Sequence, residues 1–309
     1  MNAATTSSGA VPAVPAAGAA VAGVDAGIDV DPTYDATAVR SAAVVVRAYS
    51  TSFGWACRLL GDDVRDHVRG VYALVRVADE IVDDPRPGLS VAERGELLDE
   101  LEQEVARARG RGRSSNFVVH AFARTARRFG IGDDLVGPFF ASMRTDLTVT
   151  AHDEAGFAAY VHGSAEVVGL MCLRVFVAAD DAAYDRLAPG AARLGAAFQK
   201  VNFLRDLAED VDLRGRSYFP GLDVDAFDDA DRDRLLADVD ADLAAARVAI
   251  DELPRSSRLA VRVAHDLFAE LSRRLAATPA ATIRRERVRV PGPVKARLVA
   301  GALAREALR

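Results

Sequence analysis

The sequence predicts an all-α fold, and three observations support this. From about Ala36 onward, apolar residues recur at three- and four-residue spacing, which is the period of a helix with a buried face. Turn signals separate these segments, as at Pro85–Gly88 and Gly130–Gly132. The alternating apolar pattern of strands, joined by hairpin dipeptides, is missing. We therefore expect a single all-α domain of about ten helices.

The first 36 residues differ from the rest of the chain. They are rich in Ala, Gly and Pro, carry no aromatic residue before Tyr34, and lack both a basic start and a long apolar core. Such a segment buries too little apolar surface to fold and makes a poor signal peptide. We expect a disordered tail over residues 1–36 and one domain over residues 37–309.

Helical segments follow one another from residue 63 to the end of the chain. Turn signals at Gly110–Gly112 and Pro189–Gly190 add to those named above. No apolar run reaches about 18 residues, so no transmembrane helix is expected. The expected helices cover residues 63–83, 91–109, 116–129, 133–147, 154–177, 181–211, 230–253, 256–276 and 294–308.

Charge and cysteine content exclude several classes of protein. The net charge is −6, and basic residues gather after Thr282, so the remainder is acidic and nucleic acid is not an expected partner. The basic end fits either contact with anionic lipid headgroups or a solvated C-terminal helix. Cys57 and Cys172 are too few for a disulfide scaffold and lack zinc-ligand spacing.

The segment VYALVRVADEIVDD, residues 71–84, carries charge on a helix that is otherwise apolar. Arg76, Asp79 and Asp83 recur at three- and four-residue spacing and therefore share one face, with Tyr72 one turn before Arg76. Burying two like charges one turn apart is costly unless a cation or a proton compensates them. The pattern favours a functional site over a solvated face.

A second polar stripe occupies residues 194–212, LGAAFQKVNFLRDLAEDVD. Gln199, Asn202, Asp206 and Asp210 follow one another at spacings of three and four residues, and Arg205 flanks them. Carboxylate and amide oxygens suit Mg²⁺, which commonly links protein carboxylates to phosphate oxygens. Two such stripes facing each other would hold a diphosphate through its metal ions, with arginines gripping the same oxygens.

Other metal and phosphate sites find no support in the sequence. None of the five histidines lies three residues after a glutamate, as a di-iron bundle requires. Phosphate-binding and dinucleotide-binding glycine loops are also missing. A third segment, Tyr49 to Trp55, places three hydroxyl residues before two aromatic ones. It fits either a capped helix start or a set of hydroxyl donors to phosphate.

These segments together resemble the squalene and phytoene synthase family. The resemblance rests on YSTSF, YALVRVADEIVD, FQKVNFLRDLAED and GRSYFP, and extends from about residue 43 to residue 297. Within the family, the chain is most similar to bacterial phytoene synthases. The resemblance implies a helical bundle of the class I isoprenoid (terpenoid) synthase type with a central cavity.

The resemblance also implies roles for particular residues. Phe53 and Tyr72 would flank cationic intermediates, since the faces of aromatic rings carry negative charge. The four aspartates, Arg76 and Tyr72 would be catalytic. Mg²⁺, for which Mn²⁺ can substitute, would bind Asp79, Asp83, Asn202, Asp206 and Asp210. Contacts with the diphosphates, or places lining the site, are implied for Ser50, Thr51, Ser52, Tyr72, Arg76, Gln199 and Arg205.

The implied reaction joins two geranylgeranyl diphosphates head to head. It passes through a cyclopropylcarbinyl diphosphate, releases two pyrophosphates and gives phytoene, the first committed step of carotenoid synthesis, and no NADPH is expected. One alternative uses farnesyl diphosphate to make dehydrosqualene or squalene, and another is a non-catalytic helical family member. A head-to-tail chain elongator is disfavoured, because such enzymes usually carry D-D-x-x-D and this chain has Asp79-Glu80-x-x-Asp83.

Some expectations depend on the apolar product. We expect a cytoplasmic protein with peripheral contact to the inner membrane face, and a downstream phytoene desaturase is a candidate partner. The small residues Gly163 and Gly169 would either make room for two long chains or permit close helix packing. Two departures from the family are Thr51, where many members have a basic residue, and Phe268, where a tyrosine is frequent.

Overall fold

A computed structural model describes residues 31–83, 88–178 and 180–308, and it confirms the all-α prediction. Within these ranges the chain forms helices and no sheet, apart from an isolated bridge between Ala151 and Ser217. The helices are α1 (Pro32–Tyr49), α2 (Thr51–Arg58), α3 (Asp62–Asp83), α4 (Val91–Arg111), α5 (Phe117–Phe129), α6 (Asp133–Thr148), α7 (Glu154–Val161), the π-helical turn η1 (His162–Glu166), α8 (Val167–Phe176), α9 (Asp181–Arg205), α10 (Leu207–Asp212), α11 (Asp229–Glu252), α12 (Arg255–Ala276), α13 (Ala280–Ile283) and α14 (Gly292–Ala307).

The folded unit begins earlier than expected. Residues 1–30 of the expected tail lie outside the described residues, but helix α1 begins at Pro32, before the expected boundary at residue 37. The Asp31 carboxylate accepts hydrogen bonds from the amides of Thr33 and Tyr34, and a proline fits the first position of a helix. The Tyr34 hydroxyl then donates to the carbonyl of Ser114, at 2.6 Å, which ties α1 to the bundle.

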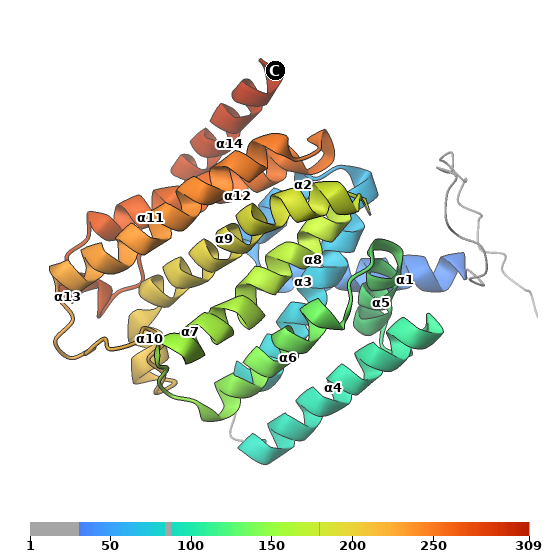
Figure 1. Cartoon of the computed structure of the whole chain (residues 1–309), viewed down its shortest axis with the longest axis horizontal. Helices are drawn as coiled ribbons and strands as arrows, with labels where there is room; N and C mark the ends of the chain where they lie inside the picture. Colours follow the sequence, from blue (N-terminus) through green and yellow to red (C-terminus); the bar gives the residue numbers. More distant parts are fainter. Residues whose placement is uncertain (1–30, 84–87, 179, 309) are drawn as a thin grey trace, which may run out of the picture. The chain divides into compact units, whose positions relative to one another are not determined.

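The two largest hydrophobic clusters of the bundle lie between Asp31 and Leu308. One joins α3, α4, α5, α6 and α8, with Leu74, Phe122 and Phe140 almost fully buried. The other joins α7, α9, α11 and α12. Helices α7 and α8 separate α6 from α9, α3 packs against α6, and α3, α6 and α9 end at the same side of the bundle (Figure 1). This arrangement brings the polar ends of three central helices together.

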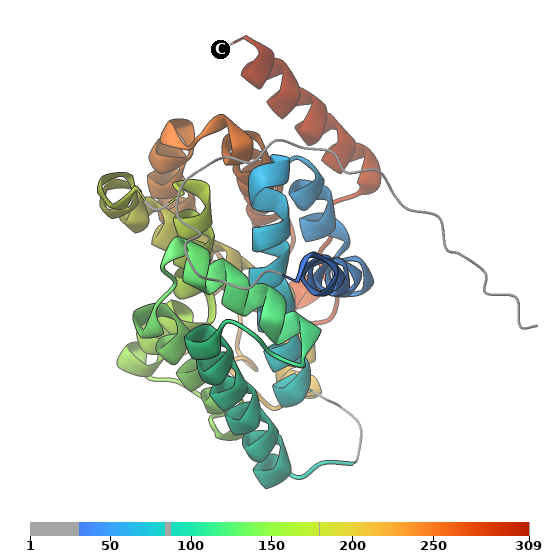
Figure 2. The same cartoon turned by 90° about the vertical axis from the view of Figure 1, so that its right-hand side faces the viewer.

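The remaining expected helices agree with the structure within two residues at each end, except for two segments. Residues 181–211 form two helices, described below with the site. Residues 154–177 form one continuous run in which the π-turn η1 separates α7 from α8. Helix α14 packs against α12 and projects from the bundle in both views (Figures 1 and 2).

The glycines of the 154–176 run permit close helix packing. A Cβ atom added at Gly163 would lie 2.4 Å from the carbonyl oxygen of Pro138, and one at Gly169 would lie 2.7 Å from that of Ala191. Across the same contact, a Cβ atom at Gly195 of α9 would lie 2.5 Å from the carbonyl oxygen of Ala165. Of the two interpretations of these small residues, the structure supports backbone-to-backbone packing.

The same run is, by length and composition, apolar enough to cross a membrane, and no other helix in the described ranges meets that test. The sequence analysis, which looked for an uninterrupted apolar run, did not expect it. The run packs between α6 and α9, and Val167, Met171 and Val175 are almost fully buried within the bundle. These contacts are those of a core helix.

A half-buried histidine of α3, His67, packs against α5 and leads to a prediction about acid stability. Burial lowers the pKa of His67 to about 4, helped by the nearby charges of Arg128 and Arg124. The unfolded chain, with a histidine pKa of about 6.5, therefore takes up the proton first as the pH falls. The contribution of neutral His67 to stability is complete above about pH 6.5 and is lost between there and pH 4.

We expect wild type to lose about 1–2 kcal/mol more stability than His67→Asn between pH 7 and pH 5. Urea unfolding of both proteins at the two pH values measures this difference. Asparagine keeps an N–H group near the position of Nδ1, which lies 2.9 Å from the Thr125 hydroxyl. Equal pH slopes for the two proteins would contradict the assignment.

Candidate functional site

The first acidic motif lies on the last turns of α3. Arg76 forms an ion pair with Glu80 and lies 3.8 Å from a carboxylate oxygen of Asp79. The guanidinium group of Arg76 also stacks 4.7 Å above the ring of Tyr49. The opposite face of α3 is buried in the core, for example at Ala78 and Val82. The apolar pattern therefore orients the helix, and the polar stripe faces away from that core.

The second motif lies where α9 ends, and the expectation of one helix over residues 181–211 is wrong. Asp206 adopts φ −101° and ψ 11°, caps α9 and precedes α10. Its carboxylate has arginine partners on both sides: Arg205 donates to it over 2.9 Å, and Arg287 approaches it to 2.8 Å. The apolar pattern continues through the break.

Arg216 contacts both motifs. Its guanidinium group donates to the Asp83 carboxylate over 2.8 Å, and its backbone N–H donates to the carbonyl oxygen of Asp210 over 2.9 Å. Asp210 in turn accepts a 2.6 Å bond from Arg214. The structure thus brings the end of α3 and the segment after α9 to one place, with arginine between the carboxylates.

We refer to the carboxylates and arginines of the two motifs, together with Arg216, as the array. Three groups that the sequence analysis did not single out complete it: Asp146, Tyr160 and Tyr218. Asp146, near the end of α6, is buried and accepts hydrogen bonds from the hydroxyl groups of Tyr160 (2.8 Å to both oxygens) and Tyr218 (3.3 Å). One sequence signal could have found it: Asp146 is a carboxylate among the apolar residues of α6. Tyr218 follows Arg216 within the GRSYFP segment.

The electrostatics of the array favour a bound cation. Burial raises the pKa of Asp79 to about 7; Arg76 opposes the rise, and the charges of Asp83 and Asp146 add to it. Burial likewise raises the pKa of Asp210 to about 6, against the nearby Arg214, and the Asp83 carboxylate again contributes to the rise. Carboxylates that resist ionisation because they are buried, and because other carboxylates lie nearby, gain from any added positive charge.

The donor atoms fit a hard cation, although they are not arranged around one. In the described part of the chain, no three Asp, Glu, His or Cys side chains are grouped closely enough to hold a metal ion. Arginines pair with the carboxylates instead. The Oδ1 atom of Asn202, however, is buried and accepts no hydrogen bond. A buried amide oxygen without a partner, close to carboxylates, is the kind of ligand that Mg²⁺ takes.

The expected hydroxyl residues lie where α1 ends and α2 begins. Ser50 caps the end of α1, and its side chain is hydrogen-bonded to the Tyr72 hydroxyl, next to Arg76 and Asp79. Thr51, Ser52 and Phe53 begin α2, but their side chains lie outside the described part of the structure. The choice between a helix start and a phosphate contact thus stays open for these hydroxyls.

Two further positions of interest lie on α9 and α12, which pack against each other. Gln199 is half-buried on α9, one turn before Asn202. Phe268 of α12 stacks on Phe198 of α9, with ring centroids 3.8 Å apart. The phenylalanine that replaces a frequent tyrosine therefore packs against the helix that carries the second motif.

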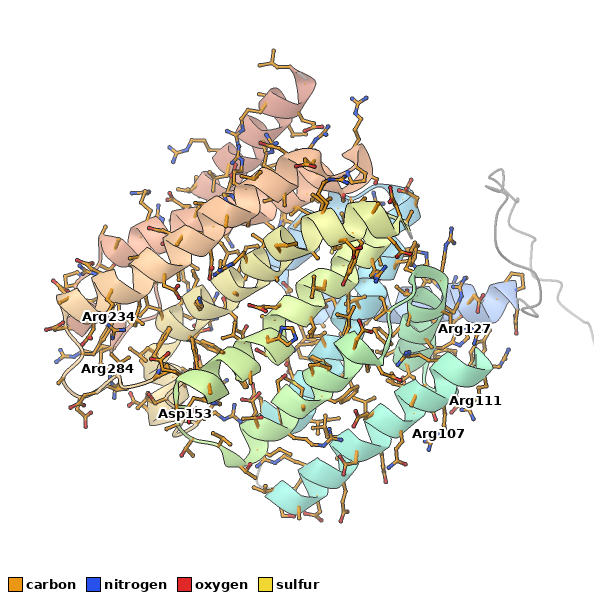
Figure 3. The ribbon with its side chains drawn as sticks, viewed as in Figure 1. Arg107, Arg111, Arg127, Asp153, Arg234 and Arg284 are labelled. Atoms are coloured by element: carbon orange, nitrogen blue, oxygen red, sulfur yellow. The ribbon has the colours of Figure 1, made fainter. Side chains whose placement is uncertain are left out.

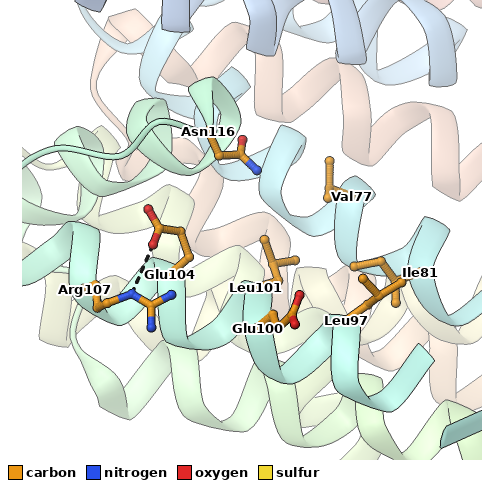
Figure 4. Close-up of a pocket in the computed structure, with 8 residues that line it drawn as sticks. All are labelled: Val77, Ile81, Leu97, Glu100, Leu101, Glu104, Arg107 and Asn116. Atoms are coloured by element: carbon orange, nitrogen blue, oxygen red, sulfur yellow. Dashed lines mark hydrogen bonds and ion pairs between the residues drawn. The ribbon is translucent and has the colours of Figure 1, made fainter. Parts of the chain in front are cut away.

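Two pockets lie between helices of the bundle. One, of about 510 Å³, is lined by Val77 and Ile81 of α3 and by Leu97 and Leu101 of α4, with the Glu104–Arg107 ion pair at one end (Figure 4). It contains none of the expected site residues. The other, of about 540 Å³, lies between α6 and α7 and reaches Tyr160. The expected central cavity is neither of these pockets and stays a prediction.

The C-terminal segment reaches back to the same end of the bundle. Arg284, just after α13, pairs with Asp212, and Arg287 pairs with Asp206. Figure 3 shows Arg284 and Asp153, the N-cap of α7, at one end of the bundle, and Arg107, Arg111 and Arg127 at the other. Arg287 was counted in the sequence analysis as part of a basic end, and its role beside Asp206 was missed.

Comparisons with known proteins agree with this architecture. A phytoene synthase from Mycobacterium tuberculosis is 29% identical over 195 residues, which cover 61% of this chain and 59% of that protein. A 4,4'-diapophytoene synthase from Staphylococcus haemolyticus is 26% identical over 205 residues, covering 62% of this chain and 67% of that protein. The chain thus spans about three fifths of the mycobacterial relative.

Solved structures share the fold. The crystal structure of a dehydrosqualene synthase superposes with a TM-score of 0.69 at 18% identity, covering 90% of this chain and 99% of that one. The fold is therefore the helical isoprenoid synthase fold. The sequence model of squalene/phytoene synthase matches residues 46–293, a range that includes both acidic motifs. The chain belongs to the squalene/phytoene synthase family.

Proposed function

We propose that this protein is a prenyltransferase that joins two geranylgeranyl diphosphates head to head and forms phytoene. The observation that carries the proposal is the convergence of the two acidic motifs at Arg216, which contacts Asp83 with its side chain and Asp210 with its backbone. The names of the bacterial relatives support the reaction class.

The residues of the two acidic motifs have roles in this reaction. Mg²⁺, held by Asp79, Asp83, Asn202, Asp206 and Asp210, would stabilise the charge of the departing pyrophosphate. The guanidinium groups of Arg76 and Arg205 lie beside those carboxylates and would donate to phosphate oxygens.

The surroundings of the array matter for the carbocation. The buried apolar faces of the central helices keep water away from the allylic cation that forms when the diphosphate leaves. That cation adds to the double bond of the second substrate, and loss of a proton closes the ring of the cyclopropylcarbinyl diphosphate. Loss of the second pyrophosphate, rearrangement and loss of a proton then give phytoene.

A second candidate is the corresponding reaction of farnesyl diphosphate. The likeness to a 4,4'-diapophytoene synthase favours it, because that relative is covered over two thirds of its length. The two candidates share the acidic motifs and differ in the length of the apolar chain that must be accommodated.

Incubating the purified protein with Mg²⁺ and each diphosphate in turn tests the proposal. We expect a C40 hydrocarbon from geranylgeranyl diphosphate, two pyrophosphates per product, and no product when EDTA removes the metal. A C30 product from farnesyl diphosphate, with none from the longer substrate, would establish the second candidate. No hydrocarbon from either diphosphate would contradict both.

Location and partners are proposed on the same basis. An apolar product must enter lipid, so we infer peripheral contact with the inner membrane face and a cytoplasmic location. A phytoene desaturase would be the next enzyme to act. Three cations of the basic C-terminal segment, Arg284, Arg287 and Arg305, form ion pairs with aspartates of the bundle. These three are therefore engaged within the fold, which leaves fewer cations for lipid headgroups.

A further inference from the structure

Asp146 is a buried carboxylate that neither the acidic motifs nor the proposed reaction assigns a role. It lies on α6, with 9% of its surface exposed. The hydroxyl of Tyr160 donates to its two oxygens at 2.8 Å each, the hydroxyl of Tyr218 lies 3.3 Å away, and a nitrogen of Arg216 approaches to 3.7 Å. Two helices, α6 and α7, and the segment after α10 thus meet at one side chain.

Arg216 is held on two sides by the Asp146 residue. One guanidinium nitrogen donates to the backbone carbonyl oxygen of Asp146 over 2.8 Å, and the carboxylate faces the other nitrogen. That other nitrogen donates to Asp83 over 2.8 Å. The side chain of Arg216 is 11% exposed, so these contacts replace water as its partners. The orientation of Arg216, and with it that of Asp83, is set by α6.

The backbone of Arg216 fixes the other motif. Its N–H group donates to the Asp210 carbonyl, and the next residue, Ser217, donates to the carbonyl of Thr150 over 2.8 Å. The segment after α10 is thus anchored to the segment after α6. Displacement of Arg216 would therefore alter the position of Asp83 relative to Asp210.

A purely stabilising role would not require a charge at residue 146. Buried ion pairs are often no more stabilising than apolar residues of the same volume, because desolvation offsets their attraction. The tyrosine hydroxyls and the arginine instead form a network in which each donor points at an acceptor. Such networks outside the ligand sphere orient metal-binding carboxylates in other proteins.

We propose that Asp146 is a positioning residue: through Arg216 it sets the distance between Asp83 and the second acidic motif, and so the affinity of the site for a metal–pyrophosphate pair. The inference rests on the proposed function, because it assumes that the two motifs bind metal together. It adds α6, with Tyr160 and Tyr218, to the elements that determine the site.

Binding of Mn²⁺ in the presence of inorganic pyrophosphate, measured by calorimetry or by electron paramagnetic resonance, tests this inference without relying on turnover. Asp146→Asn keeps the shape and an acceptor for the tyrosines but loses the charge that orients Arg216. We expect Mn²⁺ to bind at least about tenfold more weakly, and the Mg²⁺ concentration for half-maximal activity to rise in the same proportion.

The matched control is Asp242→Asn. Asp242 is also fully buried, and pairs with Lys200 and Arg193 between α11 and α9, outside the array. Its substitution should lower the melting temperature and leave Mn²⁺ binding unchanged. Should Asp146→Asn fail to fold, Arg216→Lys serves in its place, since lysine keeps the charge but has a single nitrogen, which cannot bind the Asp83 carboxylate and the Asp146 carbonyl oxygen as two guanidinium nitrogens do.

Three outcomes separate the claims. Weaker Mn²⁺ binding in Asp146→Asn, with wild-type binding in Asp242→Asn, supports the positioning role. Unchanged binding in a folded Asp146→Asn, or equal loss in both variants, overturns it and leaves the proposed function intact. A wild-type protein that binds no Mn²⁺ with pyrophosphate would overturn the metal site itself, and this inference with it.

Discussion

Replacing Asp79 with asparagine is expected to lower kcat by about a thousandfold and leave the helical fold intact. The two side chains have nearly the same shape, so the packing of α3 should not change. What is lost is a negative charge beside Asp83, and with it the attraction for the cations that would neutralise a departing pyrophosphate. Saturating substrate should not restore the rate, since the loss concerns the transition state.

The same substitution should stabilise the metal-free protein. Burial raises the pKa of Asp79 to about 7, so the folded state at neutral pH carries a carboxylate that resists ionisation. Removing it relieves repulsion with Asp83 and Asp146. Because about a third of the side chain is exposed (33%), we expect a gain of about 1 kcal/mol, or roughly 2–4 °C in melting temperature.

Steady-state kinetics with the accepted diphosphate, circular dichroism and thermal unfolding in EDTA measure these effects together. Asp185→Asn is the matched control, because Asp185 is an exposed aspartate on α9 that lies several turns before the second motif. It should leave rate and melting temperature unchanged. Wild-type turnover in the Asp79→Asn variant would contradict the assignment of Asp79 as a metal ligand.

The second large effect is expected at Gly195, where α9 crosses the π-turn. An alanine Cβ atom would lie 2.5 Å from the carbonyl oxygen of Ala165 and 3.0 Å from the Cα atom of Glu166. Both are backbone atoms, so no side chain can rotate away, and the two helices must separate. We expect Gly195→Ala to cost about 2–3 kcal/mol of stability.

The consequence should extend to the site. Asn202 and Asp206 follow Gly195 on the same helix, so a shift of α9 would move the second motif relative to Asp83. Urea unfolding and kcat measure the two effects. Gly110→Ala is the control, because no atom lies within 4 Å of the added Cβ, and it should stabilise α4 by about 0.5–1 kcal/mol. Similar unfolding curves for the two variants would show that α9 tolerates separation.

Local pattern was enough to predict most helices. The end of α5 at Phe129 could be predicted because Gly130 follows the periodic run, and Gly130 adopts the left-handed conformation expected there. The start of α6 at Asp133 could be predicted because Gly132 precedes the next periodic run. The two aspartate stripes could be assigned to helix faces because spacing alone fixes a face.

Tertiary contacts determined what the pattern missed. Arginines approach the Asp206 carboxylate from two sides where α9 ends, and one of them, Arg287, lies far along the chain. Asp146 becomes significant through Arg216 and Tyr160, which are its neighbours in space and distant in sequence. Helical periodicity describes one element at a time, so it carries no information on contacts between side chains of different elements.

The reach of Arg287 has a practical consequence for anyone who trims this polypeptide. The final helix, α14, projects from the bundle, which makes it an obvious candidate for removal. The segment between α13 and α14, however, carries Arg287, whose guanidinium group pairs with Asp206. Shortening the protein before residue 287 would leave that aspartate with one cation fewer. Truncation at this terminus would therefore change the surroundings of the second acidic motif.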